Sequence, residues 1–263
     1  MKLPHFWHVR EFGGNYGDYD FVFCYPKKLV QKWFSKAASV ITISDAMYNY
    51  VKENIGKFAN VIQIYNGVAN DKPPRKKYNE RDILQICVVG ALSEGKNQIE
   101  LLKAANLLKE SNNNFHITII GEGEEYKRIL TDYIERNNLK QYITFLGYRN
   151  DVLRILDSMD VGVICSKAEG FGRVTVEYMF SSMPVIGADR GGTSEIIENK
   201  VNGFLYTLGD YNQLSDIIYD LINDRNLLQK IGSSAYEYAC ENFYLEKNTG
   251  NIIEQIIKHN YEN

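Results

Sequence analysis

Short apolar runs alternate with segments of helical spacing along most of this 263-residue chain, and this alternation restricts the fold more than any other feature. Apolar runs bounded by glycine-bearing loops are typical of buried strands, and helices between them connect parallel strands. The pattern therefore predicts an α/β fold. Strands are expected at residues 6–9, 40–43, 61–64, 85–89, 116–120, 143–146, 161–165 and 184–186, and helices at 27–38, 46–54, 98–108, 151–158, 173–182, 211–223, 225–241 and 245–258, with a further helix ending near Asn137.

A charged, proline-bearing segment from Asp71 to Lys77 divides this pattern in two. Its two prolines cannot join the interior of a helix or a sheet, so we expect a linker there. Residues 1–72 should form part of a first Rossmann-like domain, which the chain enters in its middle. Residues 73–243 should form a complete second domain, and the helix within residues 244–263 should pack back on the N-terminal part.

The composition argues against some classes of function. The formal net charge is −3, with both signs spread along the chain, so no basic face indicates a nucleic-acid partner. The cysteines at positions 24, 87, 165 and 240 are far apart and lack the spacing of metal ligands. They are expected to be buried thiols in a reducing cytoplasm.

No stretch of the sequence is apolar and long enough to predict a signal peptide or a membrane-spanning helix. The helix expected at 27–38 has one apolar side among lysines, formed by Leu29, Val30, Trp33 and Phe34. Packing of this side on the chain's own core is the commoner arrangement, and a helix on a membrane surface is the alternative. We therefore expect a cytoplasmic protein, with contact at the inner face of the membrane left open.

A glycine-bearing stretch from Ser166 to Glu177 follows the apolar run 161–165 and predicts a turn from a buried strand into a helix. Glu169 and Glu177 lie eight positions apart, with two glycines between them that let backbone N–H groups approach a ligand. A helix N-terminus favours phosphate, and a carboxylate accepts hydrogen bonds from neighbouring hydroxyls. The stretch therefore suits a phosphorylated sugar, although an ordinary turn with two solvated glutamates has the same pattern.

Other glycine-bearing loops follow the expected strands at their carboxyl ends, at residues 90–97, 121–123 and 147–149. Parallel sheets bind ligands at this edge. These loops and the central stretch should therefore converge on one crevice.

The order of these blocks resembles that of the retaining glycosyltransferases of family 4, which have two Rossmann-like domains in the GT-B arrangement. The similarity covers nearly the whole chain. It is carried by Ile43-Ser44, Tyr65-Asn66-Gly67-Val68, Val89-Gly90, Lys96-Asn97, Ile120-Gly121-Glu122-Gly123, Phe145-Leu146-Gly147, the block from Glu169 to Glu177, Gly191-Gly192-Thr193-Ser194-Glu195-Ile196 and Asn202-Gly203. The resemblance implies a GT-B-like fold with one complete Rossmann-like domain and the C-terminal part of a second.

The resemblance also implies roles for single residues. Lys96 would hold the diphosphate of a nucleotide-sugar donor, Glu177 the ribose hydroxyls, and Glu169 would lie near the donor sugar. The backbone of Gly170-Phe171-Gly172 would meet the sugar and the phosphate. His8 resembles a family histidine that approaches the donor sugar, although a purely structural histidine is an equal alternative. Glu169, Lys96 and His8 are thus the expected catalytic residues.

Further positions complete the expected donor site, and two features depart from the family pattern. Gly90 belongs to the donor-binding set, and Tyr148 and Arg149 fall where the family lines the base pocket, unless they are ordinary loop residues. Ala91 stands where the family often has an arginine, and Arg173 could supply the missing cation. Family members also carry further strands upstream of the position where this chain starts.

These matches predict a glycosyltransferase that moves a hexosyl unit, with retention, from a nucleotide sugar to a glycan, lipid-linked or protein acceptor. UDP-sugars are favoured over GDP-sugars as donors. Neither a metal nor another cofactor is expected, because no carboxylate–histidine cluster has ligand spacing. The acceptor would attack from the front side, with the leaving diphosphate taking its proton.

Three alternatives remain at this point. The chain could be a nucleotide-sugar-binding remnant or subunit that is inactive until a partner chain completes the first domain. It could also be a sugar epimerase, or a glycosidase in which Glu169 and Glu177 flank the scissile bond. Because an incomplete sheet exposes an edge, self-association or a partner chain is also expected.

Overall fold

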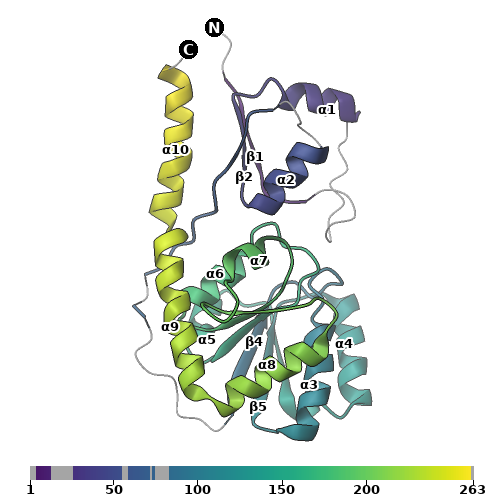
Figure 1. Ribbon diagram of the computed structural model, residues 1–263. Coiled ribbons are helices and arrows are strands. Elements are labelled where there is room, and N and C mark those ends of the chain that lie inside the picture. Colours follow the sequence, from purple (N-terminus) through teal and green to yellow (C-terminus); the bar gives the residue numbers. More distant parts are fainter. Residues whose placement is uncertain (1–3, 13–25, 55–58, 72, 75–82, 262–263) are drawn as a thin grey trace.

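The computed structural model describes residues 4–12, 26–54, 59–71, 73–74 and 83–261, and these residues form two parallel β-sheets with helices around them (Figure 1). Cys24 lies outside the described residues, and so do residues 72 and 75–77 of the expected linker. The described residues of each sheet pack on their own helices. The two sheets are therefore treated in turn, beginning with the larger one.

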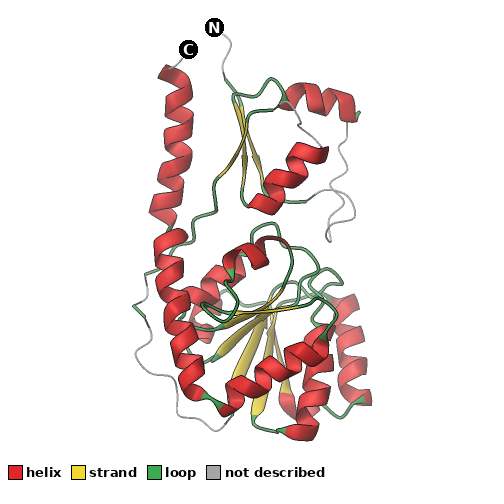
Figure 2. Ribbon diagram, viewed as in Figure 1, coloured by secondary structure: helices red, strands yellow, loops and turns green. Residues whose placement is uncertain are grey.

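The larger sheet has six parallel strands in the order β6-β5-β4-β7-β8-β9. Its central strands are buried along their length, because helices cover both faces (Figure 2). Side chains alternate between the faces: Ile86 and Val88 of β4 pack toward α3, α4 and α8, whereas Cys87 packs toward α6 and α9. The strands are β4 (Leu84–Val89), β5 (Phe115–Ile120), β6 (Ile143–Gly147), β7 (Val161–Ile164), β8 (Val185–Ala188) and β9 (Phe204–Tyr206); the helices are α3 (Ile99–Ser111), α4 (Glu124–Arg136), a 3-10 turn η1 (Lys140–Tyr142), α5 (Val152–Leu156), α6 (Arg173–Phe180), α7 (Gly191–Ile196), α8 (Tyr211–Asn223), α9 (Arg225–Asn242) and α10 (Leu245–Tyr261).

The smaller sheet has three parallel strands in the order β1-β2-β3. Its central strand β2 is buried at every position and packs with α1 and α2 around a small apolar core. Val30 and Phe34 of α1 belong to this core, each 3% exposed, whereas Trp33 on the same helix is 36% exposed. The apolar side of α1 therefore packs largely on its own sheet, and contact with a membrane stays a prediction. The elements are β1 (Phe6–Val9), α1 (Lys27–Phe34), β2 (Ser39–Thr42), α2 (Asp45–Asn54) and β3 (Val61–Gln63).

The segment after β3 contacts the start of α10, the helix that runs past the N-terminal sheet in Figure 1. The N–H of Val68 donates to the carbonyl oxygen of Phe243 at 2.8 Å, and the amide of Asn248 donates to the carbonyl oxygen of Asn66 at 3.3 Å. Gly67 lies so close to the backbone of Leu245 that a side chain would not fit between them. The C-terminal helix thus contacts the chain at the end of the N-terminal unit.

Most expected strands and helices are present, with differences at their ends. The helix expected at 27–38 ends at Phe34, because the chain turns so that the N–H of Ala38 can donate to the carbonyl oxygen of His5 beside β1. The helix expected at 173–182 ends at Phe180, and Ser182 adopts a left-handed φ of 55°. Strand β9 was not expected, since three residues carry too little pattern.

Candidate functional site

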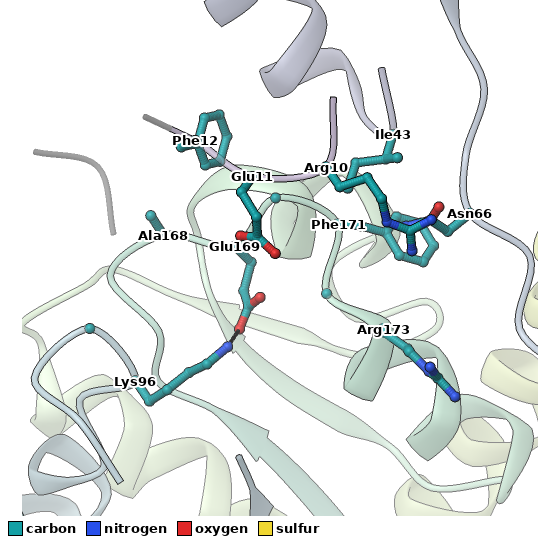
Figure 3. A pocket seen from close by; sticks show the side chains of 13 residues that line it. Arg10, Glu11, Phe12, Ile43, Asn66, Lys96, Ala168, Glu169, Phe171 and Arg173 are labelled. Atoms are coloured by element: carbon teal, nitrogen blue, oxygen red, sulfur yellow. Dashed lines mark hydrogen bonds and ion pairs between the residues drawn. The ribbon is translucent and has the colours of Figure 1, made fainter. Parts of the chain in front are cut away.

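A cavity of about 290 Å³ lies between the two sheets (Figure 3). Its lining residues share one property: each follows the carboxyl end of a parallel strand, namely β1, β2 or β3 of the smaller sheet or β4 or β7 of the larger one. This is the edge at which parallel sheets bind ligands. The cavity is lined by Arg10, Glu11, Phe12, Ile43, Asn66, Gly95, Lys96, Ala168, Glu169, Gly170, Phe171, Gly172 and Arg173.

An ion pair between Lys96 and Glu169 lies on the wall that the larger sheet contributes. The ammonium group of Lys96 contacts the carboxylate of Glu169, which also accepts a hydrogen bond of 2.8 Å from the hydroxyl of Ser166 (Figure 3). The side chain of Glu169 is only 17% exposed and that of Lys96 is 33% exposed. The expected cation and one expected carboxylate therefore meet, although they come from loops after different strands.

The loop Gly170-Phe171-Gly172 brings backbone into the cavity and leads into α6. A Cβ atom added at Gly170 would lie 2.9 Å from the carbonyl oxygen of Arg10, so the two units approach each other here at backbone distance. Gly172 has a φ of 88° and caps α6, whose N-terminus carries partial positive charge. The ring of Phe171 is buried against Tyr65 and Phe243, so mainly the backbone of this loop is available to a ligand.

Glu177 does not line this cavity. Its carboxylate accepts a hydrogen bond of 2.9 Å from Arg173, one helical turn earlier, and its side chain is 17% exposed. Burial raises the pKa of Glu177, and the charge of Arg173 opposes that shift. Arg173 itself is 74% exposed and points away from the ion pair of Lys96 with Glu169 (Figure 3).

A second cavity, of about 370 Å³, opens at the loops after β4, β5 and β6. It collects three further expected donor residues, Gly90, Tyr148 and Arg149, together with Ala91. The side chain of Lys96 passes within 3.8 Å of the place where a Cβ atom of Gly90 would be. Lys96 therefore lies between the two cavities.

His8 lies on β1 and does not line either cavity. Burial and the neighbouring charge of Arg10 lower the pKa of His8, which favours the neutral imidazole. Its expected approach to a donor sugar thus stays a prediction.

Glu11 is a charged lining residue that the sequence analysis missed. Figure 3 shows its carboxylate directed toward Glu169 from the opposite wall. Burial raises the pKa of Glu11, the charge of Glu169 raises it further, and Lys96 opposes both. The signal that could have found it is the rule that loops follow strands at the ligand-binding edge, applied to β1 as well as to the larger sheet.

Two absences concern the part of the chain that the structure describes. No group of three or more His, Cys, Asp and Glu side chains within these residues could hold a metal ion. No helix among them is long and apolar enough to cross a membrane. The expectation that no metal takes part therefore stays a prediction.

Comparisons with known proteins identify the relatives of this chain. An uncharacterized glycosyltransferase of Methanocaldococcus jannaschii is 34% identical over 76% of this chain and 54% of its own length. The N-acetyl-alpha-D-glucosaminyl L-malate synthase of Bacillus anthracis is 23% identical over 83% of this chain and 59% of its own. The chain thus spans little more than half the length of these curated relatives.

A solved structure supports the fold as well as the family. The crystal structure of Anabaena HepE, in complex with UDP and glucose, matches with a TM-score of 0.82 and 25% identity, over 96% of this chain and 71% of HepE. This match confirms the predicted α/β, GT-B-like fold with Rossmann-like sheets. Residues 70–238 match the family described as glycosyl transferases group 1, so the chain belongs to that family.

Proposed function

We propose that this chain is a retaining glycosyltransferase that transfers a sugar from a nucleotide diphosphate sugar to a hydroxyl of a glycan, lipid-linked or protein acceptor. The observation that carries the proposal is the convergence of five loops, from both sheets, on the cavity that holds the ion pair of Lys96 with Glu169. Family membership supports a sugar transfer, and the likeness to HepE, whose crystals hold UDP and glucose, supports a UDP-sugar over a GDP-sugar.

The two cavities suggest how a donor is held. A base would enter the cavity with Tyr148 and Arg149, and a sugar would enter the cavity with Glu169. The diphosphate would then lie between them, beside Lys96 and the N-terminus of α6, where a cation and helix N–H groups both favour phosphate. Glu177 would accept hydrogen bonds from the ribose hydroxyls.

The reaction would need positioning and charge stabilisation more than a protein nucleophile. We expect the acceptor hydroxyl to attack the anomeric carbon on the face from which the diphosphate leaves, and the leaving diphosphate to take the proton. Lys96 and the start of α6 would stabilise the departing charge, and no metal is required in this scheme. Glu169 and Glu11 present carboxylates on opposite walls of the space proposed for the sugar.

Two alternatives are less well supported. The glycosidase alternative paired Glu169 with Glu177 around one bond, but Glu177 is bound by Arg173 and does not line the cavity of Glu169. The comparisons do not favour an inactive nucleotide-sugar-binding subunit, since the relatives named above are an uncharacterized glycosyltransferase and a synthase.

An adjoining cavity is a candidate entrance for the acceptor. It measures about 200 Å³ and shares Phe12 and Ala168 with the cavity of Glu169. Its walls carry the polar side chains of Asn49 and Glu53 from α2 and of Arg190 before α7. Amide, carboxylate and guanidinium groups beside an aromatic ring suit a hydroxyl-bearing acceptor.

Calorimetric titration with a panel of UDP- and GDP-sugars tests the proposal. We expect binding of at least one UDP-sugar that is competed by UDP, and weaker binding of GDP-sugars. For the donor that binds, the product formed with an acceptor panel should keep the anomeric configuration of the donor by NMR. Absence of binding to every nucleotide sugar would overturn the proposal, and an inverted product would overturn its retaining part.

A further inference from the structure

The first turn of α2 is capped by two residues that lie on different units of the molecule. The N–H of Met47 donates to the hydroxyl oxygen of Ser44 at 3.1 Å, as a local N-cap would provide. The N–H groups of Asp45 and Ala46 instead donate to the carboxylate of Glu195 at 2.8 and 2.6 Å. Glu195 belongs to α7 of the larger unit and is about 150 residues away in sequence.

The chemistry of this contact favours a carboxylate. Each oxygen of Glu195 accepts one of the two N–H groups, at the end of α2 that carries partial positive charge. The hydroxyl of Tyr65 adds a longer hydrogen bond of 3.4 Å to the same group. Burial raises the pKa of Glu195, and the two N–H groups oppose that shift because they stabilise the ionised form.

The other end of α7 is bound to the proposed donor site. The N–H of Gly192 donates to the carbonyl oxygen of Glu169 at 2.8 Å. Gly191 lies so close that an added Cβ atom would be 2.6 Å from the same oxygen. The short helix therefore contacts the Glu169 loop at its start and α2 near its end, and Figure 1 shows it directly beneath α2.

We infer that Glu195 is a positioning residue. It caps α2 from the opposite unit and so holds the N-terminal sheet at a fixed distance from the donor cavity. The N-terminal sheet supplies Arg10, Glu11 and Ile43 to the cavity wall. These residues face Glu169 only while the sheet keeps its distance from the larger unit. A ligand that orders the Glu169 loop should also strengthen the cap, because α7 is bound to both. This last step rests on the proposed function.

Amide hydrogen exchange by NMR, on the whole chain, tests the inference in two stages. Without ligand, Glu195→Ala should speed exchange at Asp45 and Ala46 by about tenfold or more, since both hydrogen bonds to a charged group are lost. Exchange at Met47, which is bonded to Ser44, should change less. Glu198→Ala removes an exposed carboxylate three residues further on and serves as the matched control. Glu195→Gln, which keeps the shape but not the charge, should lie between Glu195→Ala and the wild type.

The second stage adds UDP at a saturating concentration. UDP should slow exchange at Asp45 and Ala46 in the wild type and in Glu198→Ala, but not in Glu195→Ala. A merely structural role would leave the effect of UDP unchanged in the variant.

The outcomes separate this inference from the proposed function. Equal exchange in Glu195→Ala and the wild type without ligand would overturn the cap. UDP that binds by calorimetry without slowing exchange at Asp45 and Ala46 would overturn the coupling. Failure of UDP to bind the wild type would count against the proposed function and the coupling, while the measurement without ligand would still decide the cap.

Discussion

The two units of this molecule use the same parallel-strand architecture but differ in how far they stabilise themselves. The six-stranded unit has two apolar clusters, one on each face of its sheet. The described part of the three-stranded unit has one small cluster of six buried residues. It also relies on contacts from outside, namely the cap of α2 by Glu195 and the hydrogen bonds at Asn66 and Val68. Within the described residues, the smaller unit therefore depends more on contacts from the rest of the chain than the larger unit does.

Alanine substitution of two comparable phenylalanines, one in each unit, should have the largest effect and tests whether the smaller unit depends on the larger. Phe34 in the smaller unit stacks on Trp7, and Phe115 in the larger unit stacks on Tyr142. Both are almost fully buried, so replacement by alanine should cost about 3–5 kcal/mol at either site. We expect Phe115→Ala to lower protection from hydrogen exchange in both units, because the smaller depends on the larger.

Phe34→Ala should lower protection only in the smaller unit and leave UDP affinity within about threefold of the wild type, a change below ~1 kcal/mol. Mass spectrometry of exchanged peptides separates the two patterns. If Phe34→Ala lowered protection from hydrogen exchange across β4 to β8 as much as in the smaller unit, the larger unit would depend on the smaller one too, which would contradict this comparison.

Removal of the cation tests the donor side next. Lys96→Ala should weaken UDP binding about tenfold to a hundredfold, because a hydrogen-bonded charge typically contributes about 1.5–3 kcal/mol. Uridine, which has no phosphate, should bind both proteins alike. Lys167→Ala is the control, since Lys167 lies in the loop after β7, near Glu169, but forms an exposed ion pair with Glu94. Equal losses for UDP and uridine by calorimetry would place Lys96 away from the diphosphate.

Glu177→Gln should change UDP affinity without lowering the stability of the fold. Because the pKa of Glu177 is raised by burial, the folded state holds its proton more tightly than the unfolded state does. The stabilisation from that proton is complete below the pKa that Glu177 has in the unfolded state. It is lost as pH rises through the pKa that Glu177 has in the folded state. At pH 7 the variant should therefore be at least as stable as the wild type in urea, while its UDP affinity falls about tenfold.

The same shift predicts how donor binding depends on pH. If the ionised Glu177 binds the ribose, UDP affinity should fall as pH drops through the raised pKa of Glu177, at a higher pH than an ordinary glutamate would give. Glu177→Gln should lack this step, and the exposed Glu237→Gln should keep it. A variant that is less stable at pH 7 and binds UDP normally would contradict the assignment.

Arg173→Ala should have the smallest effect. Its side chain is 74% exposed, and an ion pair whose cation lies in water contributes about 0–1 kcal/mol. We expect UDP affinity to change less than threefold, or below ~1 kcal/mol. A loss as large as that of Lys96→Ala would instead mean that Arg173 supplies the second cation which Ala91 does not.

The strands of the larger unit from β4 to β8 could be predicted because each is an apolar run followed by a glycine-bearing loop, as for Val161–Ile164 before the Glu169 loop. The meeting of Lys96 with Glu169 followed from the rule that such loops converge at one edge of a parallel sheet, supported by the family resemblance. These predictions rest on local pattern plus one topological rule.

Other contacts had no local signal. Glu11 was assigned only to a polar loop, because the rule for loops at the carboxyl edge of a sheet was applied to the larger sheet alone. Glu195 belongs to a matched block, but its partners at Asp45 and Ala46 are about 150 residues away and are backbone N–H groups, which every residue type except proline carries. Contacts between units therefore required the structure.

A crystal structure with UDP bound tests the central claim most directly, since the claim concerns where each part of the donor binds. The account predicts the uracil in the cavity of Tyr148 and Arg149, the ribose at Glu177, and the diphosphate within hydrogen-bond distance of the Lys96 ammonium, which is then shared with or withdrawn from Glu169. UDP bound elsewhere, with the ion pair of Lys96 and Glu169 unchanged, would contradict it.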